Sequence, residues 1–458
     1  MQKFFKDGNN LYPIFLLLVF AVGIYLRTRV YLTNQSFWHD ECALAWNIVN
    51  RSYRELFEPL RFLQSAPILF LITTKYLTEF FGKSEPVFRF IPYCFGVLSM
   101  VGFYFLSKKI LKTKPSIIFS NILFAVNLPL YYYSAEFKPY STDVFFCILA
   151  LILFENLNKK VLLIYSIILS AFIWFSFPAV FVLTAVIALI ILNSNYSIKE
   201  KIVYLIPQIL NGLVFYKVFF AKMFSSQKAG MTNYWQNEFI NPQNFVSLFQ
   251  KAFNFMFHDG AILIILAIAG LFIFLKEQNK FGKFALTLFL ILISASCLQL
   301  YPFSSRLILF LIPIMILLIT KTFDSKHFTS INFFILFIFC TFSEYKSTIN
   351  TVTKDNYSKN NPNPREMTEY IKSQLKTEDI IYVNSASNSD YLYYKQIYNI
   401  KNRELINTPQ YIRKNDKIWF FLPNDGIETY EKIIKNNYKI LYENRKGNSI
   451  LIYAQKIT

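Results

Sequence analysis

The chain has 458 residues, of which 54% are hydrophobic and only 16% are charged, and its mean hydropathy is +0.34. Soluble domains carry about a quarter charged residues, so this composition excludes an ordinary soluble enzyme and an intrinsically disordered chain. The apolar residues come in long blocks and not in the short alternating segments of a β-barrel. The sequence therefore predicts a mainly α-helical, polytopic membrane protein.

The formal net charge is +19. Cytoplasmic loops of membrane proteins are rich in Lys and Arg, and basic surfaces attract anionic lipids. We therefore expect membrane lipids as partners and no nucleic acid. The five cysteines show no metal-binding or disulfide spacing.

Long apolar segments recur along the first three quarters of the chain, and we predict about eleven spans. Their approximate bounds are 11–32, 86–107, 116–134, 138–157, 161–177, 179–193, 202–220, 260–275, 284–302, 305–320 and 328–343. Lysines gather in alternate links between them, which favours a cytoplasmic N-terminus and an outer C-terminus. The shorter apolar segment 66–81 would break this alternation as a span, so we expect it to lie in the outer interface.

This topology divides the chain into two predicted domains. Residues 1–344 form the transmembrane domain, with outer loops at 33–85 and 221–259. Residues 345–458 are more polar, with predicted strands at 379–384, 417–422 and 439–455. Predicted helices at 364–376, 389–398 and 427–437 separate these strands. We expect a small extracytoplasmic α/β domain.

Ionisable residues at the outer ends of the spans are the candidate site, because charge near a bilayer core is costly and suggests function. His39, Asp40 and Glu41 follow the first span, within the sequence FWHDE (37–41). Adjacent carboxylates can also be no more than solvated loop charges. Both interpretations stay open for this pair.

A second group lies in the short link YYYSAEFKPY (131–140), which carries Glu136, Lys138 and Tyr140. An aromatic belt with a surface ion pair is the alternative interpretation. The third group, YPFSSR (301–306), contains Tyr301 and Arg306, and a lone Arg at a helix end often extends to lipid headgroups.

Arg89 and His258 also lie at outer helix ends, where a structural role is the commoner one. Together the three groups place carboxylates and cations at one membrane face. A carboxylate can accept a proton from an acceptor hydroxyl, while Arg and Lys can neutralise a phosphate. This combination suits transfer from a lipid phosphate.

At these residues the sequence resembles the GT-C superfamily of polytopic glycosyltransferases. The likeness is to the branch of protein O-mannosyltransferases and lipid A aminoarabinose transferases. It rests on the order and spacing of FWHDE (37–41), YYSAEFKPY (132–140) and YPFSSR (301–306). The tail sequence EDIIYVNSASNSDYLYY (378–394) resembles the outer domain of bacterial members.

The resemblance implies that Asp40 is the catalytic carboxylate or base, with Glu41 and Glu136 as partner carboxylates. Lys138 and Arg306 would contact the donor phosphate, although Lys138 stands where Arg is usual, so a bidentate contact there is in doubt. The remaining predicted substrate contacts are Tyr140, Tyr301, Arg89, His39 and His258. Some members use a divalent ion, so Asp40 and Glu136 could hold Mg²⁺ or Mn²⁺, and the need for a metal stays open.

The expected activity is transfer of a hexose or pentose from a polyprenyl-phosphate donor to an acceptor hydroxyl, with inversion. The acceptor would be a lipid, glycan or protein at the outer face of the cytoplasmic membrane. A polysaccharide polymerase or ligase, a secondary transporter and a non-catalytic scaffold are the alternatives. Transporters often show internal repeats and broken helices, whereas this chain has only 12 glycines and no visible repeat.

Overall fold

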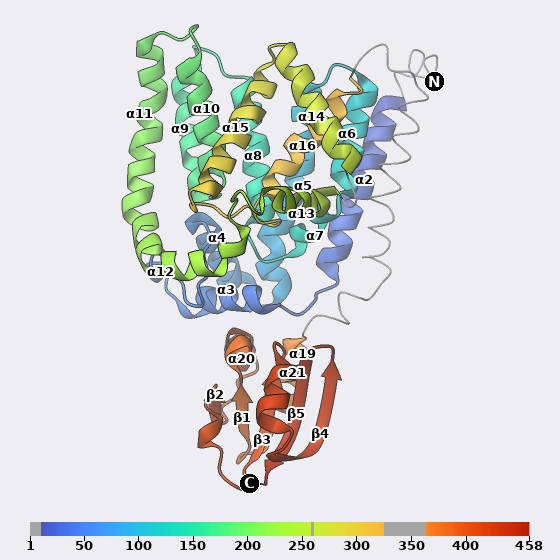
Figure 1. Ribbon diagram of the computed structural model, residues 1–458, viewed down its shortest axis with the longest axis vertical. Helices are drawn as coiled ribbons and strands as arrows, with labels where there is room; N and C mark the ends of the chain where they lie inside the picture. Colours follow the sequence, from blue (N-terminus) through green and yellow to red (C-terminus); the bar gives the residue numbers. More distant parts are fainter. Residues whose placement is uncertain (1–10, 258–260, 325–362, 458) are drawn as a thin grey trace.

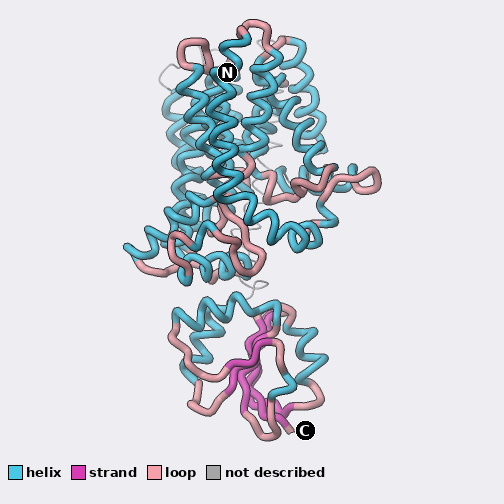
Figure 2. The backbone as a smooth tube through the Cα atoms, turned by 90° about the vertical axis from the view of Figure 1, so that its left-hand side faces the viewer, coloured by secondary structure: helices cyan, strands magenta, loops and turns pink. Residues whose placement is uncertain are grey.

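A computed structural model describes residues 11–257, 261–324 and 363–457. A bundle of helices forms the larger part, and a small five-stranded sheet lies beyond one end of it (Figure 1 and Figure 2). We call the end next to the sheet the sheet end and the opposite end the far end. The predicted span 328–343 and the candidate residue His258 lie outside the described residues.

The helices of the bundle differ in length. The bounds are α2 (Leu11–Leu32), α5 (Glu85–Ile110), α6 (Lys114–Val126), α8 (Tyr140–Glu155), α9 (Leu162–Ser170), α10 (Ala179–Leu192), α11 (Ile198–Phe215), α14 (Ala261–Lys276), α15 (Lys280–Cys297) and α16 (Ile312–Lys321). In the described part of the chain, four helices are long and apolar enough to cross a membrane, or up to six if two bent pairs count as spans. Three more apolar helices are shorter. The chain is a multi-pass membrane protein, but these helices do not confirm a count of about eleven.

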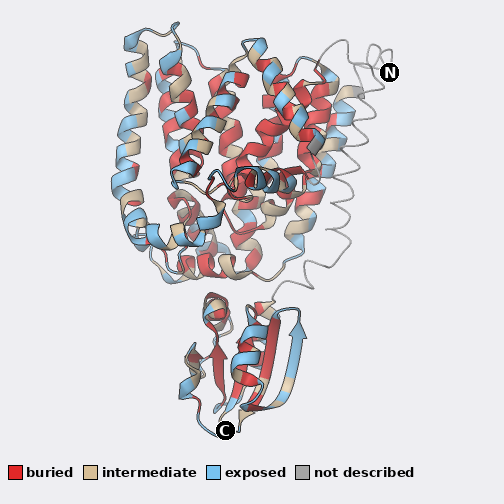
Figure 3. Cartoon of the chain, in the orientation of Figure 1, coloured by how far each residue is buried: buried red, intermediate tan, exposed pale blue. Residues whose placement is uncertain are grey.

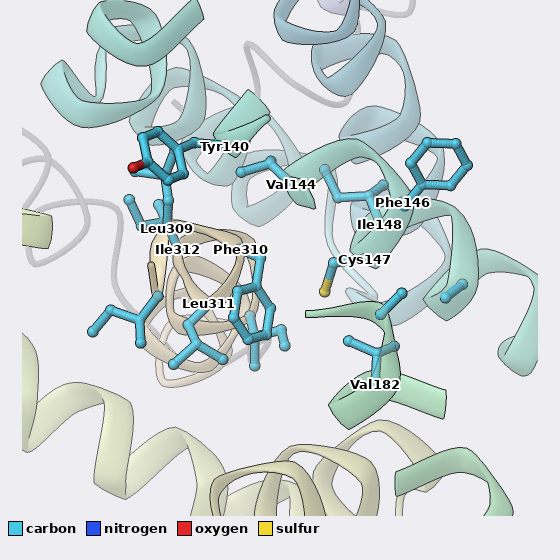
Figure 4. Packing of buried hydrophobic residues seen from close by; sticks show 14 of the residues in the cluster. Tyr140, Val144, Phe146, Cys147, Ile148, Val182, Leu309, Phe310, Leu311 and Ile312 are labelled. Atoms are coloured by element: carbon cyan, nitrogen blue, oxygen red, sulfur yellow. The ribbon is translucent and has the colours of Figure 1, made fainter. Parts of the chain in front are cut away.

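Large apolar side chains lie on the outward faces of the bundle, as on α2 and α11 (Figure 3). Such faces suit contact with lipid. The inward faces form one continuous apolar core. Near its middle, α8 packs against α10 and against the short turn η6 (Leu309–Leu311) that leads into α16 (Figure 4).

The predicted span 116–134 is broken and not continuous. Helix α6 ends before Asn127, whose side chain accepts a hydrogen bond from the N–H of Leu130 and so starts α7 (Leu128–Tyr132). Pro129 lies in the first turn, where its missing N–H costs nothing. The second piece, which runs on to Ala135, is bent by 54° from the first. The chain thereby turns at the sheet end.

The predicted loop 221–259 is largely helical. A π-helical turn, Tyr216–Phe220, continues α11 into α12 (Ala221–Tyr234), which lies across the sheet end of the bundle (Figure 1). Helix α13 (Phe245–Phe257) lies across the bundle and buries one apolar face, including Leu248 and Phe253. The predicted span 305–320 is likewise helical only from Leu309, after an irregular stretch.

Two further helices, α3 (His39–Asn50) and α4 (Ile68–Phe81), follow α2 near the sheet end. Helix α4 has 14 residues, so it is about 21 Å long at 1.5 Å per residue. This is less than the roughly 30 Å of a hydrocarbon core. Its interfacial position stays a prediction.

The lysine-rich segments at the helix ends are joined to one another by ion pairs. Lys112, between α5 and α6, and Lys321, at the end of α16, both contact Glu277 in the link between α14 and α15. Lys159, between α8 and α9, contacts Glu200 in the first turn of α11. These links therefore share the far end, as the alternation of lysines predicts.

The C-terminal sheet has the order β2-β1-β3-β5-β4. Its strands are β1 (Ile380–Val383), β2 (Glu404–Ile406), β3 (Lys417–Leu422), β4 (Tyr438–Lys446) and β5 (Ser449–Lys456). Strand β1 is parallel to β2 and β3, whereas β5 is antiparallel to β3 and β4. The predicted strands are present, and the three-residue β2 is an addition that the sequence pattern missed.

Alternate residues of the sheet face two apolar clusters. Helices α19 (Pro364–Gln374) and α20 (Asn388–Ile397) pack on one of them. The predicted helix 427–437 is a four-residue helix, α21 (Gly426–Thr429), followed by a π-helical turn. Helix α20 also contacts α3, so the sheet is docked on the bundle.

Candidate active site

The first predicted motif lies at the start of α3. Trp38 has extended backbone and caps the helix, and the Glu41 side chain accepts a hydrogen bond from the Trp38 N–H at 3.4 Å. Carboxylates in the first turn are favoured by the helix dipole. Asp40 and Glu41 are neighbours in sequence, yet the helix points them to different partners.

Both carboxylate oxygens of Glu41 accept hydrogen bonds within the protein. Arg89 of α5 donates to both of its oxygens, at 2.9 and 2.6 Å, and the N–H of Phe137 donates to it at 2.6 Å. Both charged side chains are buried, at 1% and 6% exposure. Arg89 also donates to the carbonyl of Gln35 at 2.6 Å. This pair joins three segments and leaves neither charge free for a substrate.

Asp40 faces the third predicted motif. Its Oδ2 lies 3.1 Å from Nη1 of Arg306, and both side chains are slightly exposed. The Arg306 guanidinium lies over the rings of Trp38 and Trp235, with ring centroids 5.3 and 5.4 Å away. Such contacts stabilise a cation. The chain therefore holds an accessible carboxylate and guanidinium side by side.

Gln64 connects this pair to the second motif. Its Nε2 donates to Asp40 Oδ1 at 3.4 Å, and its Oε1 accepts from Lys138 Nζ at 2.6 Å. Sequence reasoning missed Gln64, because a lone amide in a loop carries no charge or motif. Its buried position between two charges is visible only in the fold.

Glu136 lies in the link that the broken helix α6–α7 creates. Ser134 of this link lies against Gly96 of α5, where an added Cβ would come 2.5 Å from the Ser134 Cβ. Close helix packing in membranes commonly depends on such small residues. Glu136 is buried, and its Oε1 has no hydrogen-bond partner among the described residues.

The two carboxylates have opposite electrostatic environments. Burial tends to raise the pKa of Asp40, but Lys138, Arg306 and His39 outweigh it and lower that pKa below its usual value. Burial and the charge of Glu41 raise the pKa of Glu136 to about 8, although Arg306 and Lys138 oppose them. At neutral pH Asp40 is thus ionised and Glu136 is protonated.

The possible metal ligands do not fit a divalent cation. Asp40 is paired with Arg306 and Glu41 with Arg89, while Glu136 keeps its proton at neutral pH. Nearby guanidinium and ammonium groups repel a metal ion. The described residues also contain no group of three or more His, Cys, Asp or Glu arranged to hold one.

The other predicted substrate-binding residues differ in how close they lie to the Asp40 and Arg306 pair. Tyr140 packs edge-on against Tyr133 and lies close to Arg306. The Tyr301 hydroxyl instead donates to the carbonyl of Leu307 at 2.8 Å, so it holds the irregular stretch that carries Arg306. His39 points to the C-terminal unit, 3.2 Å from Asp390.

The C-terminal unit holds the loop that precedes α3. The Tyr394 hydroxyl accepts from the N–H of Phe37 and donates to Glu85 of α5, both at 2.9 Å. Arg365 of α19 pairs with Glu85 at 3.2 Å and donates to the carbonyl of Asn34 at 2.8 Å. The sheet unit therefore fixes the segment that delivers Trp38 and Asp40.

Comparison with known proteins identifies the fold. No family model and no curated protein sequence matches the chain. ArnT from Cupriavidus metallidurans, an aminoarabinose transferase, matches in its apo state with a TM-score of 0.60 at 10% identity, over 98% of each chain. The same protein bound to undecaprenyl phosphate matches with a TM-score of 0.61 at 11% identity, over 96% of this chain and 97% of that one.

The oligosaccharyltransferase AglB from Archaeoglobus fulgidus, solved with an inhibitory peptide and a dolichol-phosphate, matches with a TM-score of 0.50 at 10% identity. That match covers 95% of this chain and 74% of AglB. Both proteins are GT-C enzymes. The chain therefore has the GT-C glycosyltransferase fold over nearly its whole length.

Proposed function

We propose that the chain is a membrane glycosyltransferase that moves a sugar from a polyprenyl-phosphate donor to an acceptor hydroxyl. The observation that carries this proposal is the accessible pair of Asp40 and Arg306, with Lys138 beside it, at one end of an apolar bundle. ArnT, which has this fold, was solved with undecaprenyl phosphate. The site end and the sheet would face outward from the cytoplasmic membrane, with the lysine-rich links in the cytoplasm.

In the proposed reaction the acceptor oxygen attacks the anomeric carbon while the bond from that carbon to the phosphate oxygen breaks. The hydroxyl proton passes to the Asp40 carboxylate, which is ionised at neutral pH. The bonding electrons leave with the polyprenyl phosphate. Attack from the opposite side inverts the anomeric centre.

The cations act on the leaving group. Arg306 and Lys138 would neutralise the phosphate, and the phosphate would compete with Asp40 for the Arg306 guanidinium. Glu41 and Arg89 have a positioning role in this proposal, because their mutual contacts leave no group free. Gln64 would hold Asp40 and Lys138 at a fixed separation.

The test uses the purified full chain in lipid vesicles with a panel of synthetic undecaprenyl-phosphate sugars, hexoses and pentoses both included, and with alkyl glycosides added as acceptor hydroxyls. The release of undecaprenyl phosphate is measured by mass spectrometry. The wild type should consume at least one donor, and Asp40→Asn should lose that activity while it remains folded. Asp425→Asn is the matched control, because Asp425 is exposed in the C-terminal unit. Full activity of Asp40→Asn, or no donor consumed by the wild type, would overturn the proposal.

A further inference from the structure

A cavity of about 220 Å³ lies between the bundle and the C-terminal unit, and its lining includes Trp38, whose ring also contacts Arg306. Its wall combines the end of α2 and the following loop, the link that carries Glu136, and the start of α19. The lining residues used below are Trp38, Ala135, Glu136, Asn363, Arg365 and Glu366. The cavity thus exists only where the sheet unit docks on the bundle.

Two buried polar atoms in this wall have no hydrogen-bond partner among the described residues. They are Oε1 of Glu136 and Nε1 of Trp38. Buried polar groups are normally paired, because an unpaired one costs free energy. One is an indole N–H that can only donate and the other belongs to a carboxyl group. Both atoms are themselves covered, so a ligand reaches them only after a small shift of the two side chains. A hydroxyl-bearing ligand can then pair with both, since a hydroxyl donates and accepts.

The charges of the wall disfavour a phosphate. Arg89 is held by Glu41, and Arg365 is paired with Glu85. Glu366 adds a further carboxyl group to the lining. No cation of the described lining is therefore free for an anion, whereas neutral hydroxyl groups suit this mixture of donors and acceptors.

The size of the cavity limits the ligand further. Its volume of about 220 Å³ equals that of about seven water molecules at roughly 30 Å³ each. This accommodates one sugar ring. The Trp38 side chain, which also lies under Arg306, joins the cavity to the proposed reaction centre and offers an apolar face to a ring.

We propose that this cavity is a sugar subsite, which holds a single hydroxyl-bearing ring between Trp38, Glu136 and the start of α19. The proposal rests on the proposed function, because it places the ring beside the groups that would act on the glycosidic bond. It also gives the C-terminal unit a direct role, since α19 supplies part of the wall. The ring can come from the donor or from the acceptor.

The first experiment measures binding without turnover. The full chain in nanodiscs is examined by saturation-transfer NMR with the methyl glycosides of glucose, galactose, mannose, N-acetylglucosamine and arabinose at millimolar concentration. Ala135→Phe should fill the cavity and reduce the saturation signal at least fivefold. Ala229→Phe is the matched control, because Ala229 is exposed on α12 and lines a separate surface hollow.

Trp38→Phe provides a second variant if Ala135→Phe does not fold. It keeps a ring but loses the N–H, which has no partner among the described residues, so it should weaken glycoside binding with an unchanged unfolding temperature. No saturation signal with the wild type, or equal signals in both variants and the wild type, would overturn the subsite. Because this measurement needs no donor, it can fail while donor consumption persists, and the reverse.

Donor consumption in vesicles separates the two sources of the ring. If the donor sugar occupies the cavity, Ala135→Phe should raise the KM for donor hydrolysis in the absence of any acceptor. If the acceptor sugar does, hydrolysis should stay unchanged and only transfer to an added glycoside should fall. Unchanged hydrolysis and unchanged transfer would count against the subsite.

Discussion

The two ends of the bundle each hold a cluster of four ionisable side chains from segments far apart in the sequence. We call the first the outer cluster, and its members are Asp40, Glu136, Lys138 and Arg306. We call the second the inner cluster, and its members are Lys112, Glu277, Lys321 and Asp324. Each cluster brings together helix ends and links, so location and charge alone do not distinguish them.

Hydrogen bonding does distinguish them. In the inner cluster the Asp324 carboxylate accepts from the N–H groups of Lys112 and Thr113 at 2.9–3.0 Å and lies 3.6 Å from Lys321. In the outer cluster one Glu136 oxygen has no partner in the part of the chain that the structure describes, and the contact of Asp40 with Gln64 is long, at 3.4 Å. A cluster with every group paired fastens the fold, whereas unpaired groups beside a cavity remain available to a ligand.

The largest expected contrast is between Asp40→Asn and Asp324→Asn. Removing a general base costs about 10²–10⁴-fold in rate, so the first variant should lose donor consumption while its unfolding temperature falls only slightly, by the loss of one partly exposed ion pair. Breaking a buried charged network costs about 3–5 kcal/mol, so the second should unfold at a lower temperature yet stay active while folded. Initial rates and thermal unfolding in the same vesicles check both. Parallel losses of rate and stability in the two variants would contradict the distinction.

Arg306→Lys should have a smaller effect. The charge is kept, but the planar fork that binds phosphate oxygens bidentately is lost. We expect the KM for the donor to rise about tenfold, by roughly the free energy of one charge-assisted hydrogen bond. Lys112→Arg in the inner cluster is the control, because its side chain is exposed and forms an ion pair with Glu277. A kcat loss without a KM change would place Arg306 outside phosphate binding.

Substitution of two glycines tests the difference between a catalytic and a structural position further. A Cβ at Gly96 would meet the Ser134 side chain in the link to Glu136, whereas one at Gly270 would run into the backbone of Leu318. Gly96→Ala should therefore lower kcat several-fold by displacing that link, since small shifts of reacting groups reduce rate strongly. Gly270→Ala should lower the unfolding temperature more and leave kcat of the folded protein unchanged. Equal kcat values in the two variants would refute this assignment.

Much of the architecture was predictable because apolar length and lysine alternation act over whole segments. The three outer motifs were found because charge beside an apolar span is rare, and two of them do meet at Asp40 and Arg306. The C-terminal strands followed from their period of two. The fold of aminoarabinose transferases and oligosaccharyltransferases agrees with the predicted resemblance.

What the sequence could not provide is the pairing of individual atoms. Asp40 and Glu41 look equivalent in the motif. In the first turn of α3, however, these neighbouring side chains point in different directions, Glu41 to Arg89 and Asp40 to Arg306. The break in the predicted span 116–134 lies at the capping Asn127, which resembles any polar residue in a helix. Gln64 has no pattern of its own, because its position follows from the surrounding fold.

The last expected effect concerns the protonation of Glu136. The unfolded chain releases this proton near the ordinary value of 4.5, whereas the folded protein keeps it up to about 8. Between these values the folded state binds one more proton, so the free energy of unfolding falls as pH rises, by at most about 1.4 kcal/mol per unit. Glu136→Gln removes this dependence, because an amide does not titrate.

The unfolding temperature of Glu136→Gln should therefore rise relative to the wild type from pH 5 to pH 8 and stay level above about 8. Glu428→Gln is the control. The Glu428 carboxylate is exposed and its hydrogen bond to Lys432 lowers its pKa, so any effect on stability appears only as pH falls below the ordinary value of 4.5. Between pH 5 and 8 this control should keep a constant difference from the wild type. A constant difference for Glu136→Gln as well would mean that Glu136 is ionised in the folded protein, and the outer cluster would then hold two carboxylates instead of one.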